Sequence, residues 1–395
     1  MSTIDESMKS TVSQPRALAA ASAARQTTNP LVRFLKQVLL SDYFVLYLII
    51  VFFVVASIFF PTLSAPGNIS NQLSNIWPLL VVAVGQTFVL ILGGIDLSQG
   101  SIMAITSVVG ALLITQTLDA PTFDKSPLWG TFINEQGGLL SAVPNGPLLG
   151  VLIMLLLGTL IGLWNGFAIT KLRMAPFMVT LVTSIFFSAF ALWLTASRNV
   201  SGLPGDFLLL GKGDIVSVYL GPKLTPDIAR RDILPFITYP FMIAVGVSIA
   251  AHFILKRTVF GRQMFSVGTN RRASEVSGIS STRVMIAVYA FSGFCAAVSA
   301  ILYSARLEIG RPSLGDGLLM DIIGAAVIGG TSLFGGKGSI KGTLFGVTFF
   351  VLLLNILNAM RLSPFVIDAV KGIVILIAAL LDITRTRLIN RETRS

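Results

Sequence analysis

Charged residues are scarce in this chain of 395 residues. Lysine, arginine, aspartate and glutamate make up 12% of it, about half the share that is usual in a soluble domain. Hydrophobic residues account for 54%, and the mean hydropathy is +0.82. This balance excludes an ordinary soluble protein and predicts a polytopic helical membrane protein.

Cysteine and histidine occur once each, as Cys295 and His252. A single cysteine excludes an internal disulfide framework, and Cys295 lies in an apolar run, where a small buried side chain is expected. Histidine, cysteine and acidic residues form no cluster with metal-ligand spacing, so we expect no metal site. No nucleophile stands beside an acid–base pair either, which disfavours an integral membrane enzyme.

A phosphate-binding loop is also missing. Residues 330–338 are rich in glycine, but a P-loop requires G-x-x-x-x-G-K followed by Ser or Thr. Thr331 stands five residues before Gly336, and Gly338 replaces the hydroxyl residue that would bind magnesium. We therefore expect no cofactor on this chain. Any ATP-driven process would need ATP and magnesium in a partner ATPase.

What the sequence does contain is ten apolar runs that are long enough, or nearly long enough, to cross a bilayer. They cover residues 43–60, 76–93, 100–117, 147–169, 176–196, 235–255, 284–305, 318–334, 341–360 and 364–382. The sequence thus predicts an all-α fold with about ten transmembrane helices in one domain, 43–384.

Gly158, Gly162 and Gly166 form two GxxxG steps, which predict a close contact between helices.

The basic residues indicate the orientation of these helices. If both termini are cytoplasmic, 19 of the 29 lysines and arginines fall in cytoplasmic segments and nine in outer loops. The cytoplasmic segments then include the N-terminal tail 1–42, predicted to be partly disordered, the loop 256–283 and the C-terminal tail 385–395. The outer loops include 118–146 and 197–234. This asymmetry explains the net charge of +11 without a nucleic-acid partner.

A single carboxylate lies between the second and third apolar runs. Asp96 stands within residues 93–101, where two glycines come before it and Ser98 follows it. A charge between two membrane segments is costly, so Asp96 marks a candidate site, and a tight polar turn at the membrane surface is the alternative. Nearby backbone and hydroxyl groups are potential donors to the carboxylate. We hypothesise that Asp96 pins a broken junction between two helices and carries no proton.

The longest predicted cytoplasmic loop, 256–283, contains signals for a short helix. Asn270 is a suitable N-cap and Gly278 a suitable terminator. The face between them mixes basic, acidic and small side chains, and an ordinary solvated loop is the alternative interpretation. The candidate docking residues are Gly268, Asn270, Arg271, Arg272, Ala273, Glu275, Ser277 and Gly278.

A third polar block lies near the end of the chain. Asp321 precedes a glycine-rich turn, and the ninth run then carries Asn355 and Asn358 three residues apart, so that they face nearly the same way. Buried amides either bridge helices or contact a polar solute, and both interpretations stay open. In the tenth run, Asp368 and Lys371 are spaced to form an ion pair on one helix face.

The three blocks, 82–110, 258–310 and 318–382, together resemble the permease subunits of carbohydrate ABC importers, in the ribose/xylose branch of the binding-protein-dependent transport family. The first block carries Gly85-Gln86-Thr87 and the stretch around Asp96, with Gln99 where the family usually has an aliphatic residue. The resemblance implies a multi-pass permease in the bacterial inner (plasma) membrane. It would form the translocation pathway for a pentose, hexose or related polyol.

The resemblance also implies partners. They are a second permease copy or paralogue, cytoplasmic ATPase subunits that bind ATP and magnesium, and a periplasmic sugar-binding protein. The loop 256–283 would dock on the ATPase.

An aromatic stripe in the fifth run is a candidate for the pathway. Phe186, Phe190 and Trp193 lie on one helical face, together with Thr183 and Ser197. Sugars stack on aromatic rings and hydrogen-bond to hydroxyl groups, although a face that contacts another helix or lipid is the ordinary interpretation. The pathway or junction candidates are Gln86, Asp96, Ser98, Phe186, Phe190, Trp193, Asp321, Asn355 and Asn358.

One alternative function stays open. An ion-coupled secondary transporter would use Asp96 or Asp321 as the carboxylate that binds a proton. Such transporters place their substrate sites on interrupted helices, and the glycine-rich break at 93–100 is compatible with that arrangement.

Overall fold

The fold is described from a computed structural model of the chain, over residues 41, 43–219 and 233–392. The predicted N-terminal tail, 1–42, falls almost wholly outside these residues, as do the last three residues of the predicted C-terminal tail. Ten helices of the described part coincide with the ten apolar runs. They are α3 (Phe44–Phe59), α4 (Pro66–Ile91), α5 (Gln99–Ile114), α7 (Gly146–Lys171), α8 (Pro176–Leu194), α10 (Tyr239–Arg257), α13 (Ser281–Leu307), α14 (Leu318–Ile328), α15 (Ile340–Ala359) and α16 (Pro364–Glu392).

The helix lengths fit a membrane protein. Six helices, α4, α7, α8, α10, α13 and α15, are long and apolar enough to cross a membrane, and α3, α5 and α14 are shorter apolar helices. Proline occupies the first turn of α4, α7, α8 and α10, where its missing N–H group costs no hydrogen bond. The all-α polytopic fold predicted from the sequence is confirmed. The expected break between the second and third runs separates α4 from α5.

The shorter elements are η1 (Pro61–Ser64), α6 (Ala120–Phe123), α9 (Gly205–Lys212), α11 (Val259–Thr269), α12 (Arg271–Val276) and two antiparallel hairpins, β1–β2 (Ile133–Asn134, Gly137–Gly138) and β3–β4 (Asp214–Tyr219, Ile233–Thr238). The sequence did not indicate the hairpins. Because β4 takes the first residues of the run predicted at 235–255, α10 begins only at Tyr239, after the N-cap Thr238. The eighth run also ends early, at Ile328, because Gly330 turns the chain with a φ of +85°.

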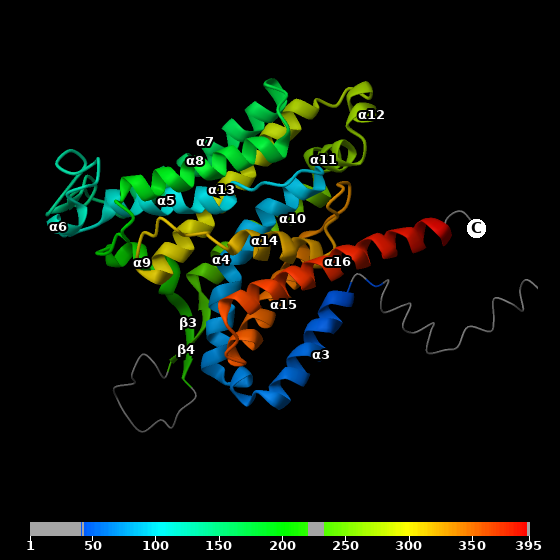
Figure 1. Ribbon diagram of the computed structural model, residues 1–395, viewed down its shortest axis with the longest axis horizontal. Coiled ribbons are helices and arrows are strands. Elements are labelled where there is room, and N and C mark those ends of the chain that lie inside the picture. The colour runs from blue at the N-terminus through cyan, green and yellow to red at the C-terminus, as the bar shows by residue number, and fades with distance from the viewer. Residues whose placement is uncertain (1–40, 42, 220–232, 393–395) are drawn as a thin grey trace, which may run out of the picture.

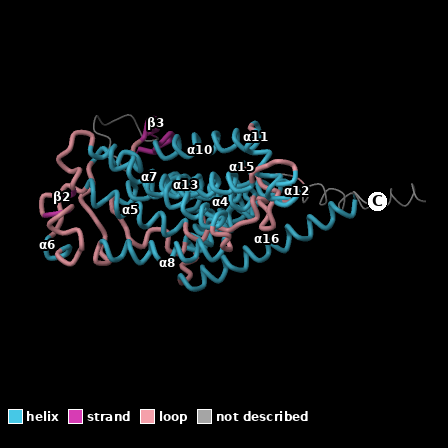
Figure 2. Tube along the Cα trace, turned by 90° about the horizontal axis from the view of Figure 1, so that it is seen from above, coloured by secondary structure: helices cyan, strands magenta, loops and turns pink. Residues whose placement is uncertain are grey.

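The predicted cytoplasmic loop 256–283 lies far from the predicted outer loop 118–146. Figure 1 shows α6 at the left and α11 with α12 at the upper right, and Figure 2 shows the same separation from above. At the left end, the Gln116 N–H donates to Gly202 O and the Gly138 N–H donates to Thr115 O, both at 2.9 Å. The end of α5 thus contacts both of the predicted outer loops, 118–146 through Gly138 and 197–234 through Gly202.

Helix α13 lies at the centre of the molecule, against α4, α5 and α7. Its contact with α7 depends on the predicted GxxxG steps. A Cβ atom added at Gly162 would lie 2.2 Å from the Tyr289 carbonyl oxygen, and one at Gly158 would lie 2.7 Å from the Gly293 carbonyl oxygen. The predicted close contact is therefore confirmed. Fewer than half of the residues of α7, α8 and α10 are buried, so these helices have surface available for lipid or for another chain.

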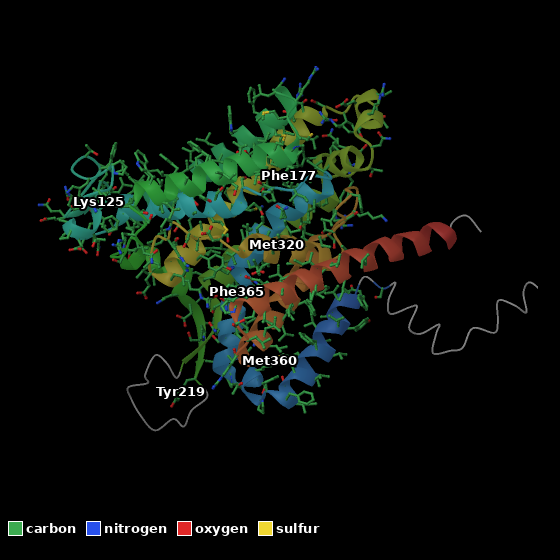
Figure 3. All side chains as sticks on the ribbon, viewed as in Figure 1. Lys125, Phe177, Tyr219, Met320, Met360 and Phe365 are labelled. Carbon is green, nitrogen blue, oxygen red and sulfur yellow. The ribbon has the colours of Figure 1, made fainter. Side chains whose placement is uncertain are left out.

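The orientation can be tested by labelling single cysteines in a Cys295→Ala background. Lys125→Cys and Ser217→Cys should react with a membrane-impermeant thiol reagent in intact spheroplasts, because both positions are exposed in the predicted outer loops. Figure 3 shows Lys125 at the left end of the molecule. Ser126 is unsuitable since it is buried and donates to the Leu194 carbonyl oxygen at 2.6 Å. Ser277→Cys, which is exposed at the opposite end, is the control and should react only after lysis. The reverse pattern would show that the orientation is wrong.

Candidate functional site

The break between α4 and α5 holds a buried carboxylate, that of Asp96. Its Oδ1 accepts hydrogen bonds from the Ser98 backbone N–H at 3.0 Å and from the Ser98 hydroxyl at 2.5 Å. Its Oδ2 accepts from the Ser292 hydroxyl of α13 at 2.7 Å. Both oxygens are therefore held by neutral donors, and the side chain has no exposed surface. The carboxylate thus links the break between α4 and α5 to α13.

The hydrogen bonds of Asp96 continue into a network across four helices. The Asn165 amide of α7 donates to the Ser98 hydroxyl at 2.8 Å, and the Thr183 hydroxyl of α8 donates to Asn165 Oδ1 at 2.7 Å. On the other side, Gln99 Nε2 of α5 donates to the Ser292 hydroxyl at 2.8 Å. We call Asp96, Ser98, Gln99, Asn165, Thr183 and Ser292 the junction network. All six side chains are buried.

Sequence reasoning missed most of this network. It selected Asp96 and Ser98, placed Thr183 only on the aromatic stripe and noted Gln99 only as a departure from the family pattern. Asn165 did carry a signal, because it is the one amide in the otherwise apolar run 147–169. An isolated polar residue in such a run needs a partner on another helix.

Some buried polar atoms near this break have no protein partner among the described residues. They are both amide atoms of Gln86, Oε1 of Gln99 and the Tyr289 hydroxyl. The Tyr289 hydroxyl lies close to the break, since a Cβ atom on Gly94 would be 2.8 Å from it. Buried groups of this kind normally hydrogen-bond to ordered water or to a solute.

The predicted short helix in the loop 256–283 is confirmed as α12. The Asn270 side chain caps it by accepting from the Ala273 N–H at 3.0 Å. At the other end, Gly278 has a φ of +83°, and the Ile279 N–H returns to the Ser274 carbonyl oxygen at 3.0 Å. This is a Schellman motif, which requires the left-handed backbone that glycine adopts without strain.

The surface of α12 presents charged and apolar groups together. Arg271 Nε lies 3.1 Å from Glu275 Oε1, and this hydrogen bond lowers the pKa of Glu275 below its usual value. Arg272 is exposed beside them, and Val276 is 86% exposed. On the neighbouring turn, Phe334 is 78% exposed. The sequence had not indicated Val276 or Phe334, because exposure of single apolar residues leaves no periodic pattern.

The aromatic stripe lies on the outer face of α8. Phe186 and Trp193 are largely exposed and stack on either side of Phe190, with ring centroids 5.8 and 5.6 Å apart. They line an open groove of this helix. Thr183 points instead into the junction network, and Ser197 lies beyond the end of α8, so these two residues are not part of the exposed stripe.

The two asparagines of the ninth run do not share a site. The Asn355 amide donates to Asn68 Oδ1 of α4 at 2.8 Å, so it bridges two helices. Asn358 is exposed near the end of α15. The structure therefore favours the bridging interpretation for Asn355. Asn358 does not take part in this bridge.

Asp321 is distant in sequence from its partner, Lys371. Lys371 Nζ lies 2.9 Å from Asp321 Oδ1 and 3.4 Å from Asp368 Oδ1. The Asp321 side chain is 4% exposed and that of Asp368 is 74% exposed. The pair expected within α16 is present, but the buried pair between α14 and α16 is the closer one.

Comparison with known proteins assigns the family. The model of the family described as "Branched-chain amino acid transport system / permease component" matches residues 68–379. The ribose import permease protein of Bacillus subtilis is 33% identical over 331 residues, which cover 83% of this chain and 88% of that protein. The ribose import permease protein of Escherichia coli K12 is 31% identical over 334 residues, covering 85% and 91%.

The xylose transport system permease protein of Haemophilus influenzae is 27% identical over 358 residues, covering 80% of this chain and 88% of that protein. No solved structure matches the chain. The matched region contains both the break at Asp96 and the helix α12. This multi-pass membrane protein is therefore a transport permease subunit and belongs to the family of branched-chain amino acid transport system permease components.

Proposed function

We propose that this chain forms the pathway through which an ATP-driven importer moves a sugar across the bacterial inner (plasma) membrane. The substrate class is a pentose, a hexose or a related polyol. The main support is the similarity to ribose and xylose permeases over four fifths of the chain or more. Nothing in the comparisons favours an ion-coupled secondary transporter.

The energy would come from a separate cytoplasmic ATPase that binds ATP and magnesium. In this chain the glycine-rich stretch 330–338 connects two helices, α14 and α15. A P-loop instead follows a strand, and its glycines leave space for phosphates. Docking of that ATPase on α12 is supported by the exposed charged and apolar groups at this end.

A second permease, identical or paralogous, would complete the pathway. The aromatic stripe of α8 faces outward from the single chain, so a sugar can contact it inside a closed pathway only if another chain covers it. A periplasmic sugar-binding protein would deliver the substrate to the predicted outer loops, 118–146 and 197–234.

The proposed function is tested in proteoliposomes that contain this chain and its cognate ATPase, with the binding protein outside. Ribose, xylose, a hexose and a polyol are offered in turn, with ATP trapped on the ATPase side. Accumulation of at least one of them that depends on ATP is expected. Accumulation driven by a pH gradient without ATP would overturn the proposal.

Docking is tested by reversing one charge on α12. Glu275→Arg places a third positive charge beside Arg271 and Arg272 and removes the ion pair. We expect the amount of ATPase that copurifies with the permease and the sugar uptake to fall together, while membrane insertion persists. Glu135→Arg, an equal charge reversal at an exposed position of the opposite end, is the matched control and should leave the amount of copurified ATPase unchanged. Full retention of the ATPase by Glu275→Arg would remove α12 from the interface.

A further inference from the structure

Three segments that are far apart in the sequence meet at the end of α4. A Cβ atom on Gly268 of α11 would lie 1.8 Å from the carbonyl oxygen of Ile91, the last residue of α4. The Gly336 N–H donates a hydrogen bond to the same oxygen at 2.9 Å. A Cβ atom on Gly335 would lie 2.6 Å from the Gly268 carbonyl oxygen. Backbone therefore contacts backbone among α4, α11 and the turn 330–338.

This contact is rigid because no side chain separates the segments. Gly335 and Gly336 have φ values of +85° and +72°, which other residues rarely adopt. At Gly268 the obstacle to a side chain is a carbonyl oxygen, and a backbone atom cannot move aside by changing its rotamer. We call Ile91, Gly268, Gly335 and Gly336 the glycine contact.

The glycine contact is joined to the docking helix. The hydroxyl groups of Ser266 on α11 and Ser274 on α12 lie 2.7 Å apart, and the Ser274 hydroxyl also donates to the Asn270 carbonyl oxygen at 2.9 Å. Ser274 is buried between the two helices although the rest of α12 is exposed. These bonds hold α12 against α11 as one unit.

On the other side, the glycine contact leads into the junction network. Only four residues separate Ile91 from Asp96. Within them, the Gly93 N–H donates to the Leu90 carbonyl oxygen at 2.8 Å, and the Gly94 N–H donates to the Val89 carbonyl oxygen at 3.1 Å. Gly93 also contacts the turn 330–338, since a Cβ atom on it would lie 3.4 Å from the Phe334 carbonyl oxygen. Asp96 in turn is linked to α8 through Ser98, Asn165 and Thr183.

We propose that Gly268 is a positioning residue for transport, through which movement of α12 reaches the α4–α5 break and, by way of the junction network, the aromatic face of α8. This inference rests on the proposed docking of an ATPase on α12. The physical basis is a continuous series of backbone contacts and hydrogen bonds that leads from α12 through α11 and the end of α4 to Asp96, and from there to α8.

The first test is Gly268→Ala in the reconstituted importer. The new methyl group must push α11 away from α4 by more than about 1 Å, a displacement large enough to disturb a positioned site. We expect the ATPase to remain bound and to hydrolyse ATP, while sugar uptake per ATP hydrolysed falls about tenfold, within the range of allosteric coupling. Gly246→Ala on α10, where a Cβ atom meets nothing within 4 Å, is the matched control and should transport normally.

Equal uptake per ATP in Gly268→Ala and Gly246→Ala would overturn the inference, although the proposed function would stand. If the wild-type importer itself fails to take up sugar with ATP, the proposed function fails first. The two failures are thus distinguished by the wild-type control.

A second test does not depend on whether Gly268→Ala folds. In a Cys295→Ala background, Ser266→Cys and Ser274→Cys place two thiols where hydroxyl groups are 2.7 Å apart, so oxidation can join α11 to α12. If the two helices move as one unit, uptake in the oxidised protein should equal that in the reduced protein. Loss of uptake on oxidation, with recovery on reduction, would show that α12 moves independently and would overturn the inference.

Discussion

Replacing Asp96 with leucine should abolish ATP-driven uptake and lower the thermal stability of the protein, whereas asparagine should retain part of both. Leucine leaves the Ser98 N–H and the Ser292 hydroxyl without their acceptor, and each unsatisfied buried donor costs about 1–3 kcal/mol. Asparagine keeps the shape of the side chain, and its carbonyl oxygen can still accept from Ser98. Uptake in proteoliposomes and the melting temperature in detergent measure the two effects.

The same pair of variants separates a structural carboxylate from a proton carrier. If Asp96 carried a proton, asparagine would be as inactive as leucine in accumulation, while substrate exchange would survive. The deciding comparison is uptake with ATP and no pH gradient against uptake with a pH gradient and no ATP. Accumulation that the gradient drives alone, and that Asp96→Asn loses, would contradict the structural role of Asp96.

The second large effect is expected at the buried ion pair between α14 and α16. Lys371→Met removes the cation that lies 2.9 Å from Asp321 and leaves that carboxylate buried without an opposite charge. Breaking such a pair from one side typically costs about 3–5 kcal/mol, because the remaining charge is not solvated. We expect a marked fall in melting temperature and in the yield of folded permease.

Two further variants test this explanation. Combining Lys371→Met with Asp321→Leu removes both charges, and stability should return to within about 1 kcal/mol of the wild type. Asp368→Asn should change stability by less than about 1 kcal/mol, because Asp368 is largely exposed and lies farther from Lys371. If Asp368→Asn proved the more damaging change, the assignment of Asp321 as the main partner would be wrong.

Local patterns in the sequence predicted a large part of this structure. Apolar runs of bilayer length placed ten helices, because a membrane span has to satisfy its own backbone hydrogen bonds and carries few charges. Asn270 and Gly278 predicted both ends of α12, because capping depends on residues within one turn. The GxxxG steps of α7 predicted a close contact, since small residues at helical spacing leave a smooth face.

Some features were not predicted, or were predicted only in part, because they depend on contacts with segments that are distant in the sequence. The run 235–255 lost its first residues to β4, whose pairing with β3 stabilises an extended chain that hydropathy cannot distinguish from a helix start. Lys371 was expected to pair with Asp368, three residues away, but its closer partner is Asp321 on another helix. A rule based on spacing along one helix cannot identify the closer partner when that partner lies on another helix.

The sequence by itself determined the class of protein and its ten apolar helices. It also indicated two polar regions between them, namely the break at Asp96 and the loop 256–283. It could do so because hydropathy and capping are properties of neighbouring residues. Only the tertiary structure decided which groups surround Asp96, and that Gly268 contacts the end of α4. Those contacts join residues from different helices, and their distances depend on how the helices pack, which no local pattern encodes.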